Sequence, residues 1–98
     1  MPSALPQKII DQMNKAGLPL SGPHPFKPKL TRNRHGVLLI ERRAVARGPK
    51  RGKRGYVDEQ GRVWVKDRAH AGLPDHWDVQ IDDGDRYVRI DQGGNELT

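Results

Sequence analysis

The sequence predicts an α+β domain, with a short N-terminal helix packed on a twisted, mainly antiparallel sheet of four to five strands. Three observations favour this class: one amphipathic segment near the N-terminus, several short apolar and β-branched segments after residue 36, and turn residues between them. The chain has 98 residues, enough for one small domain. We expect residues 1–35 to form the helix and a proline-rich irregular lead-in, and residues 36–98 to form the sheet that carries the site.

The helix is predicted over residues 5–16, where apolar side chains recur on one face. Pro6 suits a first helical position, and Gly17 is expected to cap the C-terminus of the helix. Residues 18–29 contain four prolines, a composition that predicts an extended and irregular segment.

The sheet is predicted from the segments that follow. Residues 36–45 are expected to be mostly strand, although periodicity leaves open a helix over residues 41–46. Beyond them, alternating apolar residues predict an antiparallel meander. Its first two strands lie on either side of a Glu-Gln-Gly turn within residues 56–65. The third covers residues 77–81 and the fourth residues 86–91. An Asp-Asp-Gly-Asp turn separates the last two, and its glycine suits a positive φ.

Charge is distributed unevenly along the chain. Residues 1–56 contain 13 Lys and Arg against two acids, a net charge of +11, whereas residues 57–98 contain five against ten, a net charge of −5. A basic half indicates nucleic acid or an acidic protein as partner. The absence of cysteine excludes disulfides and thiolate metal sites. No apolar run reaches the roughly 20 residues of a membrane span, and no signal-peptide pattern opens the chain, so an exported form is expected to travel within a larger protein.

Basic residues concentrate between residues 42 and 54. Because each neutralised phosphate releases counterions, such a surface is expected to bind RNA with strong salt dependence. The alternative is a solvated linker, and residues 47–55 are expected to form an exposed, mobile loop. Only five residues are aromatic, which favours recognition of structured RNA by shape and phosphate over sequence reading. The predicted RNA-binding residues are Arg42, Arg43, Arg47, Lys50, Arg51, Lys53, Arg54 and Lys66.

The segment from Asp67 to Asp78 holds two histidines and three aspartates, which are residue types of general acid–base catalysis. His76 and Asp78 are two residues apart, so they share one face of a predicted strand. Gln80 continues that face, which leaves Trp77 on the core side. A polar face is costly unless it meets solvent or substrate, so the alternatives are a solvated sheet face and an active site.

These residue types suit RNA cleavage by attack of the 2′-hydroxyl on the adjacent phosphorus. One group removes the hydroxyl proton, another protonates the departing 5′-oxygen, and an arginine stabilises the developing charge. The same side chains could ligate a metal, but their spacing matches no metal signature, so neither a metal nor another cofactor is expected. The candidate catalytic residues are Asp67, His70, His76, Asp78, Arg86 and Arg89.

The C-terminal half resembles the cytotoxic ribonuclease domain of the rRNA-cleaving colicins and of related polymorphic and contact-dependent inhibition toxins. The resemblance covers under half of the chain. It lies in a basic lead-in at residues 53–56, a glycine turn at 60–62, an aromatic strand at 63–66, the element Asp67-x-x-His70 and a similar ending at 94–97.

The resemblance implies that His70 acts as the acid with Asp67 in support, and that the base is His76 or Asp78. In the family a charge-stabilising arginine lies in a C-terminal tail with no counterpart in this sequence, so either Arg86 or Arg89 replaces it or nothing does. The resemblance also implies a larger delivery protein, a cognate acidic immunity protein, and action in the cytoplasm of a target bacterium.

The sequence therefore predicts a toxin endoribonuclease that cleaves ribosomal RNA in a target cell without a metal. A tRNA-cleaving toxin and a non-catalytic RNA- or ribosome-binding module are the alternatives. A metal-dependent DNA nuclease that uses the same His/Asp cluster is a further one.

Overall fold

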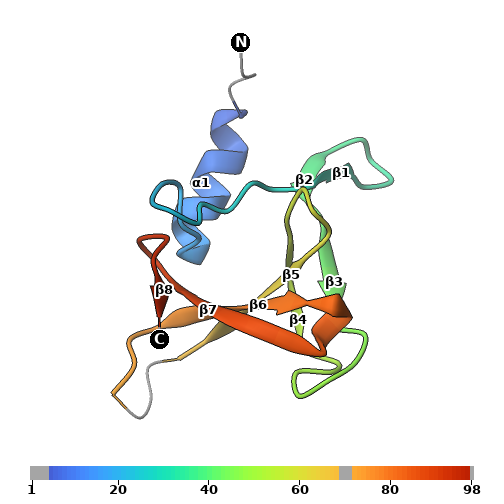
Figure 1. Ribbon diagram of the computed structural model, residues 1–98. Helices are drawn as coiled ribbons and strands as arrows, with labels where there is room; N and C mark the ends of the chain where they lie inside the picture. Colours follow the sequence, from blue (N-terminus) through green and yellow to red (C-terminus); the bar gives the residue numbers. More distant parts are fainter. Residues whose placement is uncertain (1–4, 69–71, 98) are drawn as a thin grey trace.

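One helix and eight short strands make up the fold in the computed structural model, which describes residues 5–68 and 72–97 (Figure 1). In chain order they are α1 (Gln7–Ala16), β1 (Leu30–Arg32), β2 (Leu38–Ile40), β3 (Arg42–Ala44), β4 (Arg54–Val57), β5 (Val63–Asp67), β6 (His76–Ile81), the 3-10 turn η1 (Asp82–Gly84), β7 (Arg86–Asp91) and β8 (Glu96–Leu97). β1 pairs with β2, and β3 to β8 form a six-stranded antiparallel sheet in that order. The predicted α+β class is confirmed, with more strands than the four to five expected. Within the described residues, no helix is long and apolar enough to cross a membrane.

The helix forms where the apolar periodicity predicted it. Ile9 and Met13 are buried on its inner face. Gly17 ends it in the left-handed conformation, at φ 80°, and its N–H bonds to the carbonyls of Asn14 and Met13. A left-handed residue at this position favours glycine, so the predicted cap is confirmed.

Residues 36–45, expected to be mostly strand, contain the two short strands β2 and β3, which belong to different sheets. The break lies at Glu41, whose N–H bonds to the Lys29 carbonyl while its own carbonyl accepts the N–H of Val57. Glu41 therefore joins the small sheet to the large one. Strand β3 follows directly, so the helical alternative over residues 41–46 is wrong. The partner strand β1 lies at the end of the lead-in that was expected to be irregular.

The meander predicted from alternation corresponds to strands β4 to β7. The buried carboxylate of Asp58 organises its first turn. One oxygen accepts the backbone N–H groups of Gln60 and Arg62, and the other accepts the Arg62 guanidinium and the indole N–H of Trp64 at 2.9 Å. The short edge strand β8 was not predicted, because two residues carry no periodicity.

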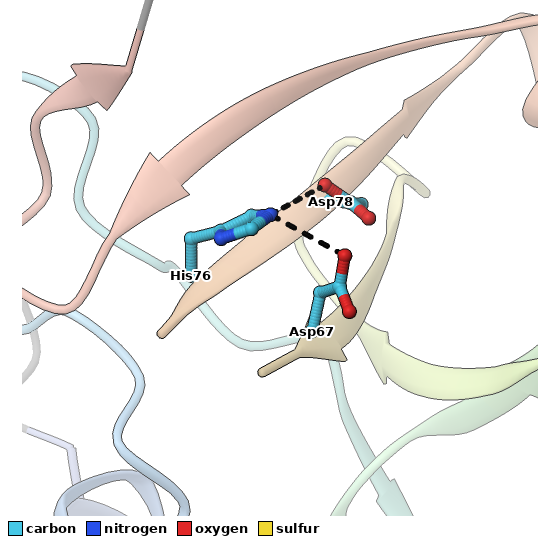
Figure 2. A group of neighbouring side chains, drawn as sticks. All are labelled: Asp67, His76 and Asp78. Atoms are coloured by element: carbon cyan, nitrogen blue, oxygen red, sulfur yellow. Dashed lines mark ion pairs between the residues drawn. The ribbon is translucent and has the colours of Figure 1, made fainter. Parts of the chain in front are cut away.

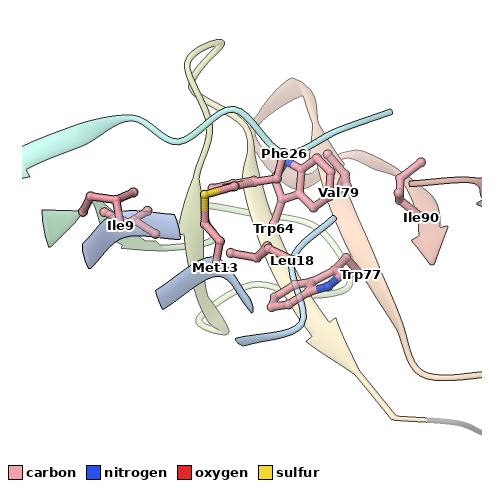
Figure 3. Close-up of a cluster of buried hydrophobic side chains, with 9 residues drawn as sticks. Ile9, Met13, Leu18, Phe26, Trp64, Trp77, Val79 and Ile90 are labelled. Atoms are coloured by element: carbon pink, nitrogen blue, oxygen red, sulfur yellow. The ribbon is translucent and has the colours of Figure 1, made fainter. Parts of the chain in front are cut away.

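The main core lies between the helix and one face of the large sheet (Figure 3). The sheet contributes Trp64, Trp77 and Ile90, and the helix contributes Ile9 and Met13. The indole N–H of Trp77 also donates to the carbonyl that caps the helix, at 2.9 Å. Burial of two indoles and this hydrogen bond together dock the helix on the sheet.

The second face of the sheet is covered as well, because the loop after β3 folds back onto η1. The N–H of Arg47 bonds to the Asp83 carbonyl at 3.2 Å, and the Arg47 guanidinium lies 3.2 Å from the Asp85 carboxylate. Gly48 packs so closely that a Cβ there would lie 1.8 Å from the Gly84 carbonyl oxygen. A small cluster of valines fills the enclosed space, formed by Val45, Val57, Val63 and Val65.

The segment that follows the helix also contacts the other end of the chain. The N–H of His24 donates to the Gly94 carbonyl at 2.8 Å, and Gly22 packs against Gly93 and Gly94 without room for a Cβ. The N-terminal segment is therefore held by the turn between β7 and β8.

Candidate functional site

Strand register brings together three of the predicted site residues on the second face of the sheet. Asp67, the last residue of β5, lies directly opposite His76, the first residue of β6. Asp78 follows two residues later on the same face. The Nε2 atom of His76 lies 3.5 Å from Asp67 Oδ2 and 3.3 Å from Asp78 Oδ1, as Figure 2 shows.

The imidazole of His76 is fixed by its other nitrogen. Nδ1 lies 2.8 Å from the Pro74 carbonyl oxygen, which can only accept, so Nδ1 carries a hydrogen. The ring is fully buried. This bond sets the tautomer and aims Nε2 at the two carboxylates, an arrangement typical of histidines that hold a proton or a metal.

A lysine completes the cluster from the loop between β3 and β4, residues 45–53, which we call the basic loop. The Lys50 ammonium lies 3.1 Å from Asp78 Oδ2 and 3.8 Å from Asp67 Oδ2. Partial burial lowers the pKa of Lys50, but the hydrogen bond to Asp78 and the charges of both carboxylates outweigh it and leave the pKa above its ordinary value of 10.5. Lys50 was predicted only as an RNA-binding residue, because no local pattern in the sequence links residue 50 to β5 or β6.

Exposure divides the cluster into an inner and an outer pair. The side chains of His76 and Asp78 are 0% and 2% exposed, whereas those of Asp67 and Lys50 are 30% and 26% exposed. Gln80, further along β6, is buried too. The expectation that this polar face meets solvent or substrate therefore needs correction: the folded-back basic loop covers it, and only the outer pair reaches the surface. We call these four residues, Lys50, Asp67, His76 and Asp78, the acid–base cluster.

The remaining catalytic candidates are placed differently. Arg89 lies directly opposite Asp78 in the β6–β7 register and shares its face, and its buried Nε has no hydrogen-bond partner among the described residues. Arg86 lies on the other face of β7 and pairs with Asp82 at 2.9 Å, so the fold does not bring it to the cluster. His70 lies outside the described residues.

Most of the predicted RNA-binding side chains are exposed, but only some are unneutralised. Arg43 pairs with Glu41 at 2.8 Å, and Arg47 pairs with two acids next to η1. Over the described ranges 5–68 and 72–97, no ion pair involves the other exposed members of the set, which are Arg42, Arg51, Lys53, Arg54 and Lys66.

The cluster also offers a possible set of metal ligands. One ligand atom from each of Asp67, His76 and Asp78 lies within 4.8 Å of the others. A nitrogen and two carboxylate oxygens suit a transition metal. The Lys50 ammonium, however, already places a positive charge beside both carboxylates, so the four side chains can balance charge and move protons without an added cation.

Comparison of the chain with protein-family models, curated proteins and solved structures finds no match.

Proposed function

We propose that this chain is a metal-independent endoribonuclease domain of the bacterial toxin type, with ribosomal RNA as its substrate. The observation that carries the proposal is the acid–base cluster itself. It places a fixed imidazole and an ammonium each within 3.1–3.8 Å of the same two carboxylates, beside a strongly basic loop. A purely structural role explains the cluster less well, because burying the ionisable side chains of His76 and Asp78 is costly.

The exposure of the cluster suggests roles for its members. Because His76 and Asp78, which the resemblance implies as base, are buried, the accessible Asp67 takes the proton of the 2′-hydroxyl in their place. The ammonium of Lys50 stabilises the charge that develops on the phosphate oxygens. His76 Nε2 lies 3.5 Å from Asp67 Oδ2 and positions that carboxylate from its buried side. Arg89 is the second cation on this face.

The reaction balances without a co-reactant. The 2′-oxygen forms a bond to phosphorus as the bond from phosphorus to the 5′-oxygen breaks, and a protonated side chain gives its proton to the leaving oxygen. The products are a 2′,3′-cyclic phosphate and a free 5′-hydroxyl. By the colicin resemblance, His70 is the proposed donor of that proton.

The same resemblance supports the proposed partners. A cognate acidic immunity protein would complement the exposed basic side chains, and delivery as part of a larger toxin would bring the domain to the target cytoplasm. Charge complementarity supports the first of these partners.

The test is cleavage of intact bacterial ribosomes and total tRNA by inhibitor-free protein with EDTA present, with new RNA ends mapped. Asp67→Asn is expected to lower the cleavage rate at least about 100-fold. His76→Gln, a change in a positioning residue, should lower the rate and also alter its pH profile. Glu59→Gln removes an exposed carboxylate elsewhere and should cleave normally.

The outcomes separate the alternatives. Cleavage of tRNA alone would change the substrate but keep the chemistry. Cleavage that requires a divalent cation would favour a metal-dependent nuclease. Intact RNA in every lane, with RNA still bound, would overturn the proposal in favour of a binding module.

A further inference from the structure

Two adjoining hollows lie on the helix side of the large sheet, away from the acid–base cluster. They have volumes of about 580 and 300 Å³ and share Ala16, Arg42 and Tyr56 in their walls. The C-terminal turn of α1 forms one side, and residues of strands β2 to β6 form the other. We call this feature the helix–sheet groove.

The groove is lined by uncompensated positive charge. Lys15 comes from the helix, Arg42 from β3, Arg54 from β4 and Lys66 from β5. No acid lines either hollow, and none of the four forms an ion pair within residues 5–68 and 72–97. Four cations from four separate elements converge here, so the groove fits a polyanion.

Aromatic rings lie beneath two of these cations. The guanidinium of Arg42 lies 5.0 Å from the centre of the Tyr56 ring, and the ammonium of Lys66 lies 6.0 Å from that of Trp77. The two rings contact each other edge to face, at 6.0 Å between centres. A guanidinium held over a tyrosine ring, as Arg42 is over Tyr56, offers a surface on which an unpaired base can stack.

Geometry links the groove to the acid–base cluster. Lys66 precedes Asp67 in β5, and Trp77 follows His76 in β6. Because neighbouring side chains of a strand point to opposite faces, Lys66 and Trp77 lie on the groove face, directly behind Asp67 and His76 on the cluster face. A chain that lies in the groove beside Lys66 and Trp77 therefore reaches the rim of the sheet where Asp67 is exposed. We propose that the helix–sheet groove binds an unpaired RNA strand next to the scissile phosphate. This inference rests on the proposed function for its substrate class.

The test compares two double variants that remove the same net charge. Lys15→Ala/Arg42→Ala removes one helix and one strand cation from the groove, and Lys8→Ala/Arg32→Ala removes one of each outside it. Binding of a fluorescent 12-nucleotide single-stranded RNA to the full chain is measured by anisotropy in EDTA at several salt concentrations. Circular dichroism melts verify that both variants fold.

We expect the groove variant to bind the RNA at least about 10-fold more weakly, and the slope of log binding constant against log salt concentration to be smaller in magnitude by about 2. The affinity of the control variant should change less than about 2-fold. Equal losses of RNA affinity in both variants would overturn the proposal that the groove is the binding site, because they would indicate that only the total charge matters. Equally tight binding of a duplex, or equal competition by polyglutamate, would overturn the single-strand specificity. Because binding is measured separately from cleavage, normal groove binding without cleavage would count against the proposed enzyme alone.

Discussion

The ammonium of Lys50 lies 3.1 Å from the buried carboxylate of Asp78, so a basic surface loop is held on the second face of the sheet. This contact places positive charge where β5 and β6 bring two carboxylates and an imidazole together. It is also one of the interactions that close the sheet over its small valine cluster. Removal of the lysine should therefore affect both stability and activity.

Lys50→Met is expected to lower the free energy of unfolding by about 2–3 kcal/mol, because it leaves Asp78 buried beside another acid without its cation. The loss should be below the roughly 3–5 kcal/mol typical of fully buried pairs, since the lysine is partly exposed. Urea unfolding measures it. The double variant Lys50→Met/Asp78→Asn should regain part of the loss, and additive effects would show that the two side chains do not interact.

The raised pKa of Lys50 predicts a pH dependence of stability. A group whose pKa is higher in the folded state stabilises the fold fully below its unfolded pKa, here 10.5, and loses that contribution as pH rises through the folded value. The stability difference between the wild-type chain and Lys50→Met should thus be constant from pH 8 to about 10 and shrink above 10.5. Unfolding curves across this range measure it, and a difference that grows with pH would contradict the assigned shift.

Two glycines of the basic loop provide a matched test of the closure onto η1. Gly48 and Gly52 have φ values of 86° and 85°, but a Cβ on Gly48 would meet the Gly84 carbonyl whereas one on Gly52 would meet nothing within 4 Å. Gly52→Ala should cost about 1–2 kcal/mol from conformation alone. Gly48→Ala should cost at least about 3 kcal/mol, because the loop must also move. Equal costs in thermal melts would mean that the loop is not held there.

Asp58 and Asp91 allow a similar comparison between a buried and an exposed turn. Both carboxylates accept backbone N–H groups two and four residues ahead, but that of Asp58 also accepts the Trp64 indole and is buried. Asp58→Ala should lower stability by about 3 kcal/mol and Asp91→Ala by about 1 kcal/mol. Chemical denaturation with tryptophan fluorescence measures both. A loss of stability at Asp58 no greater than that at Asp91 would show that the first turn forms without the Asp58 carboxylate.

The sequence predicts those parts of the fold that local patterns determine. The helix, its glycine cap and the meander from β4 to β7 follow from periodicity and turn residues, and the shared face of His76 and Asp78 follows from strand alternation. The break at Glu41 does not, because its hydrogen-bond partners are residues 29 and 57. Local patterns do not record pairings between distant segments.

The same limit applies to the site. Spacing placed Asp67, His76 and Asp78 in one candidate cluster, and register brings them together. The burial of His76 and Asp78, and the contact of Lys50 with Asp78, depend on how the basic loop folds back over the sheet. Sequence spacing does not encode that tertiary arrangement. Arg86 and Arg89 could not be distinguished by composition, but the alternation of β7 separates them onto opposite faces.

The hydrogen bond between His24 and Gly94 constrains the order in which the chain can fold. The helix itself packs on Trp64 and Trp77, which belong to β5 and β6, so its docking needs no residue beyond β6. The bond from His24 needs the turn after β7 and can form only when that turn has left the ribosome. During synthesis the helix can therefore dock first, and the tie between the N-terminal segment and the turn closes the domain last.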